Sequence, residues 1–184
     1  LIQTPTALIL MPNLPVATVI GSLKIPAFSG TFFAAKQYLK KVKIPATRFL
    51  LFTTTAFSFA FLGSYCLTLV SNQFMKPVIF FVLLIIAIYT FTKKDLGLAA
   101  LTKEIHFPWY KGAIICIAIG FYDGFIGPGA GSLLVLSFIS LLGFDFLQAN
   151  AHAKVVNLAT NMGSIVLFIM KGVLLWHIAI PMAI

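Results

Sequence analysis

Residues 49–75 contain no Lys, Arg, Asp, Glu or His, and this uncharged run constrains the fold more than any other feature. A helix that crosses the hydrocarbon core of a bilayer needs about 20 apolar residues. Composition extends the conclusion to the whole chain, because 60% of its residues are hydrophobic, 9% are charged and the mean hydropathy is +1.05. Soluble domains carry about 25% charged residues. The sequence therefore predicts an all-α, polytopic integral membrane protein.

The net charge of +9 comes from basic residues that gather mainly in two connecting loops. One group lies within residues 36–48 and the other within residues 93–111. Short loops rich in Lys and Arg remain on the cytoplasmic side of a membrane, so we expect both loops there. A nucleic-acid partner would instead require a basic face on a folded element. The expected partner is the lipid bilayer, with no nucleic acid and with a homo-oligomer left open.

Five apolar segments are expected within the membrane. They cover residues 17–36, 49–70, 77–92, 112–143 and 151–170. Residues 1–92 form a first repeat unit and residues 112–184 a second, with residues 93–111 as a cytoplasmic loop between them. Because both ends of the chain interrupt an apolar pattern, we expect a fragment of a longer protein.

Residues 120–132 interrupt the fourth segment with five glycines, one proline and one carboxylate. As one straight helix, residues 112–143 would extend roughly 48 Å, whereas the hydrocarbon core is about 30 Å thick. The sequence therefore predicts a hairpin, built either from re-entrant half-helices or from two short crossings, with Pro128 placed to begin the second arm. Irregular backbone at membrane depth persists only where protein or water satisfies its polar groups. The interruption therefore indicates a site.

A weak internal repeat relates the two units at an offset of 130 positions, which pairs Lys24 with Lys154 and Lys41 with Lys171. The Lys24 segment is expected to enter the membrane from outside and the Lys154 segment from inside. The two units would then have opposite orientations, as in the inverted-topology repeats of many secondary transporters. By the same offset, a first glycine-rich hairpin is expected upstream of Leu1.

Lys24 and Lys154 are the most unusual side chains in the apolar segments, where a lysine costs about 2.5–3.5 kcal/mol on insertion scales. Each lysine either faces an aqueous site or extends its long stem to the membrane–water interface. The internal repeat favours the first alternative, an aqueous site. Lys154, Asn157 and Asn161 are spaced to share one face of a helix. A cation beside two amides suits an anion, whereas hydrogen bonding between helices is the simpler alternative.

The glycine turn would add a second set of anion-binding groups. Gly127, Gly129 and Gly131 lie where the second arm begins, and a helix start offers free N–H groups and the positive end of the helix dipole. An oxyanion would be stabilised there. Tight crossing of helices is the alternative role for these glycines.

Two residues are candidates for proton coupling. For Asp123, three roles remain open, namely an ion pair with Lys154, a cap on the second arm, or uptake of a coupling proton. His152 is the second candidate because histidine titrates near neutral pH, although a histidine near a helix start more often forms hydrogen bonds.

No catalytic or metal-binding pattern occurs in the sequence. Cys66 and Cys116 lack Cys or His neighbours at the spacings that metal sites use. Four acidic residues leave little for acid and base catalysis, and motifs of hydrolases, metalloproteases and nucleotide-binding proteins are missing. We therefore expect no enzyme activity, metal or cofactor. A structural membrane subunit, a channel and an intramembrane enzyme of unknown substrate remain as alternatives to a transporter.

Residues 120–161 contain the motifs GFYDGFIGPGAGS, LGF and ANAHAKVVNLATN. This block resembles the second half of the sulfite exporter TauE/SafE family of bacterial membrane permeases. Residues 15–43, which contain GSLK and YLKK, look like the family's first-half counterpart. The resemblance implies alternating-access transport of small sulfur-containing anions, such as sulfite or organosulfonates, across the bacterial inner membrane. Carried over by position, it implies a substrate site formed by Lys24, Gly127, Gly129, Gly131, Lys154, Asn157 and Asn161.

Overall fold

The computed structural model describes residues 3–92 and 109–183, and its regular structure in these ranges is entirely helical. In chain order the elements are α1 (Gln3–Leu10), α2 (Val16–Leu39), α3 (Ala46–Leu69), α4 (Asn72–Thr92), α5 (Trp109–Phe125), α6 (Ala130–Leu142), α7 (Phe146–Met170), α8 (Trp176–Ala179) and the 3₁₀ helix η1 (Pro181–Ala183). Within the described ranges, α2, α3 and α7 are long and apolar enough to cross a membrane. The predicted class, an all-α polytopic membrane protein, is confirmed.

Local sequence signals set several helix boundaries. Pro15 and Pro45 occupy the N-cap positions of α2 and α3, and proline is tolerated at a helix start because it lacks an N–H. Asp145 caps α7 by accepting a hydrogen bond from the Gln148 amide at 2.7 Å, as short polar N-cap residues do. Gly143, with φ of 69°, ends α6 in left-handed backbone, which glycine adopts readily. A short turn therefore joins α6 to α7.

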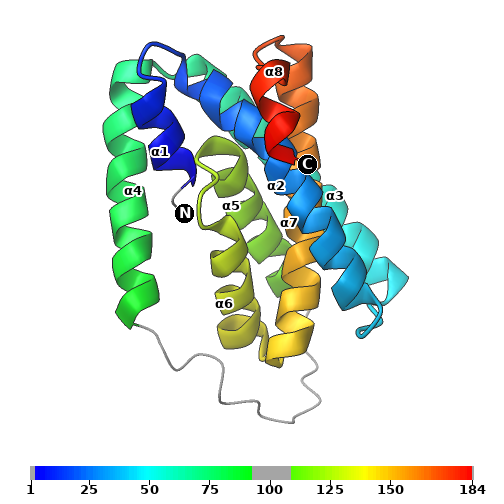
Figure 1. Cartoon of the computed structure of the whole chain (residues 1–184). Helices are drawn as coiled ribbons and strands as arrows, with labels where there is room; N and C mark the ends of the chain where they lie inside the picture. Colours follow the sequence, from blue (N-terminus) through cyan, green and yellow to red (C-terminus); the bar gives the residue numbers. More distant parts are fainter. Residues whose placement is uncertain (1–2, 93–108, 184) are drawn as a thin grey trace.

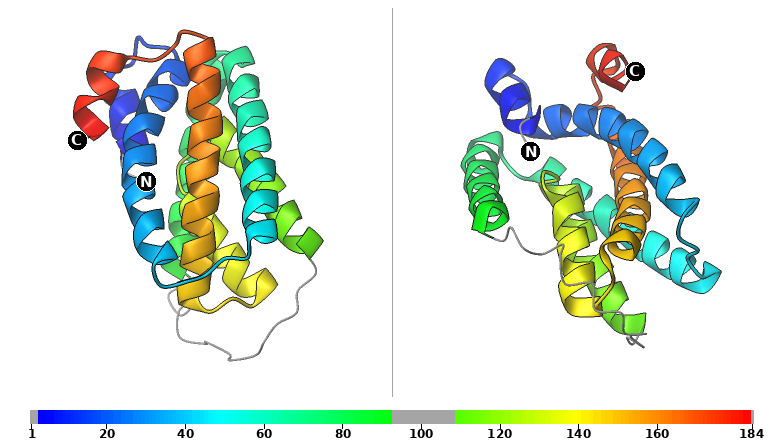
Figure 2. Two further views of the ribbon diagram at one scale, coloured as in Figure 1. Left: turned by 90° about the vertical axis from the view of Figure 1, so that its right-hand side faces the viewer. Right: turned by 60° about the horizontal axis from the view of Figure 1, so that its bottom comes forward.

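Helices α3, α5 and α7 form the centre of the bundle, with α2 packed against α7 and α6 packed against both α5 and α7 (Figure 1, Figure 2). Glycines allow the close contact between α3 and α5. A Cβ at Gly124 would lie 2.0 Å from the Ala60 carbonyl oxygen, and one at Gly63 would lie 2.2 Å from the Phe121 carbonyl oxygen. Small residues bring the backbones of membrane helices together in this way. This contact fixes α5 and the turn that follows it.

The predicted interruption of residues 112–143 is present as a break between two helices. α5 ends at Phe125, α6 begins at Ala130, and the turn between them lies about midway along the bundle (Figure 1). Pro128 does not begin α6 as expected. The N-cap is Gly129, whose φ of 85° is left-handed and cannot continue a helix, so Pro128 belongs to the turn. Whether the hairpin is re-entrant in a bilayer stays a prediction.

α2 and α7 run in opposite directions and pack against each other (Figure 1, Figure 2). They begin at Val16 and Phe146, which are positions that the predicted offset of 130 pairs. Antiparallel helices at paired positions are what an inverted repeat would require. The repeat itself, with its division at residues 1–92 and 112–184, stays a prediction.

One end of the bundle carries most of the described basic loop residues. The α2 to α3 connection, which contains Lys40, Lys41 and Lys43, lies at the same end as the start of α5 and the α6 to α7 turn (Figure 1). Of the predicted cytoplasmic loop at 93–111, residues 93–108 lie outside the described residues, and α5 begins with residues 109–111. The cytoplasmic placement of this end stays a prediction.

The outward faces of the bundle are apolar. On α4, Phe80, Phe81 and Ile85 are 64%, 61% and 64% exposed. A soluble protein rarely exposes such a continuous apolar face, whereas lipid tails would cover it in a bilayer.

Candidate functional site

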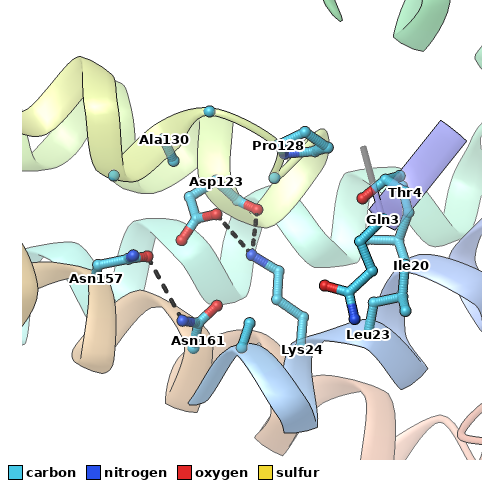
Figure 3. A pocket seen from close by; sticks show the side chains of 14 residues that line it. Gln3, Thr4, Ile20, Leu23, Lys24, Asp123, Pro128, Ala130, Asn157 and Asn161 are labelled. Carbon is cyan, nitrogen blue, oxygen red and sulfur yellow. Dashed lines mark hydrogen bonds and ion pairs between the residues drawn. The ribbon is translucent and has the colours of Figure 1, made fainter. Parts of the chain in front are cut away.

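A cavity of about 170 Å³ lies where α2, the α5 to α6 turn, α7 and the start of α1 meet (Figure 3). Six of the seven predicted binding residues line it, namely Lys24, Gly127, Gly129, Gly131, Asn157 and Asn161. Asp123 also lines the cavity. Segments far apart in the sequence therefore meet at one polar pocket inside an apolar bundle.

Lys24 and Asp123 form a buried ion pair at this pocket. The Lys24 Nζ lies 2.7 Å from Asp123 Oδ1, and the two side chains are 6% and 4% exposed. The same Nζ donates to the Asp123 backbone carbonyl at 2.7 Å. That carbonyl is in the last turn of α5, where helix carbonyls lack intrahelical partners and a cation is favoured. Lys24 therefore both neutralises the carboxylate and caps the C-terminus of α5.

Of the three roles open to Asp123, the observed contacts include neither an ion pair with Lys154 nor a cap on α6, which has no side-chain cap. The second carboxylate oxygen, Oδ2, instead accepts a hydrogen bond from the Thr160 hydroxyl on α7. Each carboxylate oxygen thus has a donor, as buried charges require. Asp123 joins α5 to both α2 and α7.

The polar face predicted for α7 forms the wall beside the ion pair. Asn161 Nδ2 approaches Asn157 Oδ1 at 3.5 Å, and Asn157 Oδ1 also lies 3.4 Å from the Thr160 hydroxyl (Figure 3). These contacts use the carbonyl oxygen of the Asn157 amide. The Asn157 Nδ2 lies 3.2 Å from the point that a Cβ at Gly131 would occupy. The donor end of the amide therefore faces the start of α6.

The start of α6 contributes a backbone donor to the same place. Across the described ranges, no carbonyl or side chain accepts a hydrogen bond from the Gly131 amide, and Gly129 provides no side-chain cap. The turn is held by the Tyr122 hydroxyl, which donates to the Pro128 carbonyl at 2.6 Å. An uncapped helix start favours negative charge. The pocket thus combines an ammonium, a free helix amide and a carboxamide N–H.

Lys154 is not among the residues that line the pocket. It is half-buried on α7, one helical turn before Asn157. Its backbone therefore lies near the pocket wall, and its side chain does not line the pocket.

His152 lies in an aromatic environment rather than at the pocket. Its ring is 4.5 Å from the Phe144 ring centroid and 6.1 Å from that of Phe138. The Gln148 carbonyl lies 2.8 Å from Nδ1, and because a carbonyl only accepts, Nδ1 carries the proton. His152 is buried and contacts the apolar core between α6 and α7.

The structure adds Thr160, Gln3 and Thr4 to the residues around the pocket. Thr160 could have been predicted from the sequence, because it follows Asn157 by three positions and therefore belongs to the same helix face. No sequence pattern predicts Gln3 and Thr4, because their proximity to the pocket depends on how α1 folds back beside the turn. In the described ranges, no group of His, Cys, Asp and Glu is arranged to hold a metal ion.

Comparison with known proteins gives one family and several relatives. The family model described as "Sulfite exporter TauE/SafE" matches residues 1–184. A "Probable membrane transporter protein" of Haemophilus influenzae is 30% identical over 174 residues, which cover 95% of this chain and 68% of the relative. "Probable membrane transporter protein ORF9" of Sinorhizobium sp. is 30% identical, with 94% and 66% covered. "Probable membrane transporter protein YfcA" of Escherichia coli K12 is 28% identical, with 87% and 59% covered.

The chain thus spans about two thirds of the length of these relatives. No solved structure matches it.

Proposed function

Because the chain belongs to the sulfite exporter TauE/SafE family, we propose that it is a permease for a small sulfur-containing anion, such as sulfite or an organosulfonate. The relatives named as probable membrane transporters support the transport class. The bacterial inner membrane is the proposed location. The proposed role is transport rather than catalysis, in line with the names of the family and the relatives.

The proposal rests on one observation, namely that N–H donors converge on a single pocket. A lysine ammonium has three N–H donors, and two of those of Lys24 are directed at Asp123. One remains for a ligand. With the Gly131 amide and the Asn157 Nδ2, it gives a small oxyanion donors from α2, α6 and α7. Such an anion has several acceptor oxygens and no donor of its own, so it matches this set.

Transport would proceed by alternating access around this pocket, with the packing of α2 against α7 as the moving contact. Helix breaks at a midplane site and antiparallel related units are features of transporters that work in this way.

Lys154 would add positive potential from one turn away on α7. Asp123 is a better proton-binding candidate than His152, because Asp123 lines the pocket whereas His152 packs among phenylalanine rings.

Transport by the full natural chain in proteoliposomes tests this function. Labelled sulfite, thiosulfate and methanesulfonate would be measured for the wild type, Lys24→Ala, Lys154→Ala and the control Lys36→Ala, whose lysine is exposed on the same helix as Lys24. We expect saturable flux that falls about tenfold or more in Lys24→Ala, because a hydrogen bond to a charged group is worth about 1.5–3 kcal/mol. Lys154→Ala should reduce flux less, and Lys36→Ala should not change it. Unchanged flux in both pocket-side variants would refute the anion site.

A further inference from the structure

The charges of the pocket cancel. Of its lining residues, Lys24 and Asp123 are the charged ones, and the others are Gly, Pro, Ala, Ile, Leu, Asn, Gln or Thr. Since the two charges are 2.7 Å apart and buried, the unliganded pocket is neutral. An anion would therefore enter a site that already contains a carboxylate bound to its lysine.

Asp123 faces few groups that could offset its charge. On α2, Lys24 is its ion-pair partner, and on α7 the neutral Thr160 donates to it. On α3, the Ser64 hydroxyl donates to the Gly124 carbonyl rather than to the carboxylate. α6 contains no titratable side chain, and on α5 itself the Tyr122 hydroxyl donates to the turn. Lys24 is thus the cation that balances Asp123 among the described residues.

An anion bound beside an ionised Asp123 would leave one uncompensated negative charge in the pocket. Uncompensated charge in a low-dielectric interior is strongly unfavourable, and proteins avoid it by binding or releasing protons. One proton on Asp123 removes the excess charge. Lys24 would keep its position meanwhile, since its bond to the Asp123 backbone carbonyl does not depend on protonation.

We propose that the pocket binds one monoanion together with one proton on the Asp123 carboxyl, so that the anion replaces the carboxylate as the counter-ion of Lys24. This inference rests on the proposed permease function and specifies its coupling. The proton comes from the aqueous phase that the pocket faces and returns to the opposite phase when the anion leaves. The empty pocket and the loaded pocket then both have zero net charge.

Neutrality in both states has a measurable consequence. The membrane potential does work on a moving charge, about 2.3 kcal/mol per elementary charge and 100 mV, and it does none on a neutral site. Transport should therefore respond to a pH difference and ignore a potential. Linkage also makes the effect reciprocal, so the anion should bind about tenfold more tightly per pH unit of acidification while Asp123 is ionised in the free protein.

The test uses the full natural chain in proteoliposomes, with labelled methanesulfonate because this anion keeps its charge across the working pH range. Net uptake would be driven by a pH gradient alone or by a potassium diffusion potential alone, and exchange would be measured with no gradient. We expect accumulation with the pH gradient and no effect of the potential. Accumulation driven by the potential, or none with the pH gradient, would overturn the inference.

Asp123→Asn mimics the protonated carboxyl without changing its size. It should bind methanesulfonate with an affinity that does not depend on pH, and accumulation driven by a pH gradient should be lost. Asp145→Asn is the matched control, since Asp145 caps α7 away from the pocket and asparagine is an equally good N-cap. The control should accumulate anion like the wild type. Accumulation by Asp123→Asn that equals the wild type would contradict the role of Asp123.

Two outcomes separate this inference from the function on which it rests. If no sulfur-containing anion exchanges in the wild type, the permease function fails, and the coupling fails with it. If exchange occurs without proton movement, only the coupling fails. A pH-sensitive dye inside wild-type vesicles measures this directly, even if Asp123→Asn does not fold, and should report one proton for each methanesulfonate taken up.

Discussion

Lys24 and Asp123, which are 99 positions apart in the sequence, form an ion pair with an Nζ to Oδ1 distance of 2.7 Å. The pair joins α2 to the end of α5, directly below the glycine turn that begins α6 (Figure 3). It therefore contributes both to the stability of the bundle and to the charge of the pocket.

Removal of Lys24 should destabilise the protein more than removal of an exposed lysine on the same helix. Lys24→Ala leaves the Asp123 carboxylate buried without its cation, and loss of one partner of a buried pair costs about 3–5 kcal/mol. Thermal unfolding in detergent at neutral pH would measure this, with Lys36→Ala as the control. The double variant Lys24→Met with Asp123→Asn, which removes both charges, should regain most of the loss. Equal stability of Lys24→Ala and Lys36→Ala would contradict a buried ion pair.

Gly127 should be required for binding as well as for stability. Its φ is +91°, and an added Cβ would lie 3.5 Å from the Lys24 Nζ. Gly127→Ala should cost about 1–2 kcal/mol, because a side chain disfavours left-handed backbone, and should also weaken anion binding. Gly172, with φ of +64° and no atom within 4 Å of the added Cβ, gives the matched control. Gly172→Ala should lose similar stability and keep its affinity, and loss of affinity in both variants would argue against a local effect.

Thr160→Val should disturb Asp123 without changing the shape of α7. The substitution removes the hydroxyl that donates to Oδ2, and an unsatisfied buried acceptor costs about 1–3 kcal/mol. Thr160→Val should therefore melt at a lower temperature than the wild type in detergent, because its Asp123 carboxylate loses a hydrogen bond. Thr54→Val is the control, since the Thr54 hydroxyl bonds to the Leu50 carbonyl of its own helix. Equal melting temperatures of Thr160→Val and the wild type would contradict the contact.

Gly124→Ala should prevent α5 from packing against α3. An added Cβ would lie 2.0 Å from the Ala60 carbonyl oxygen, and backbone cannot yield as a flexible side chain would. Overpacking costs about 1–3 kcal/mol and sometimes more, so the melting temperature and the yield of folded protein should fall. Gly30→Ala, which adds a Cβ with no atom within 4 Å, should melt at or above the wild-type temperature because alanine favours a helix. Similar melting of both variants would count against the close contact.

The helices and the interruption at the glycine turn were predictable because they depend on local composition. Long uncharged runs indicate membrane helices, and the residues around Gly129 cannot continue a helix. The face shared by Asn157 and Asn161 followed from helical spacing. The expected start of the second arm at Pro128 was wrong by two positions, because the left-handed backbone of Gly129 places the start of α6 at Ala130.

The partner of Asp123 could not be predicted in the same way. The repeat relates Lys24 to Lys154 and offers no carboxylate for either, and an ion pair with Lys154 was one of three roles that the sequence left open for Asp123. The pairing with Lys24 depends on how α2 crosses the end of α5, which is a property of tertiary packing rather than of periodicity. His152 was a candidate for proton coupling in the sequence, whereas in the structure the rings of Phe138 and Phe144 pack around it.

The central claim is that the pocket between Lys24, the start of α6 and Asn157 binds a small anion. Equilibrium binding of labelled methanesulfonate to the purified full natural chain tests it most directly, with wild type, Gly131→Ala and Gly30→Ala compared. The added Cβ of Gly131→Ala would lie 3.2 Å from the Asn157 Nδ2 and would crowd this donor. We predict saturable binding that weakens about tenfold or more in Gly131→Ala and is unchanged in Gly30→Ala. No saturable binding to the wild type, or equal affinity in all three proteins, would contradict the claim.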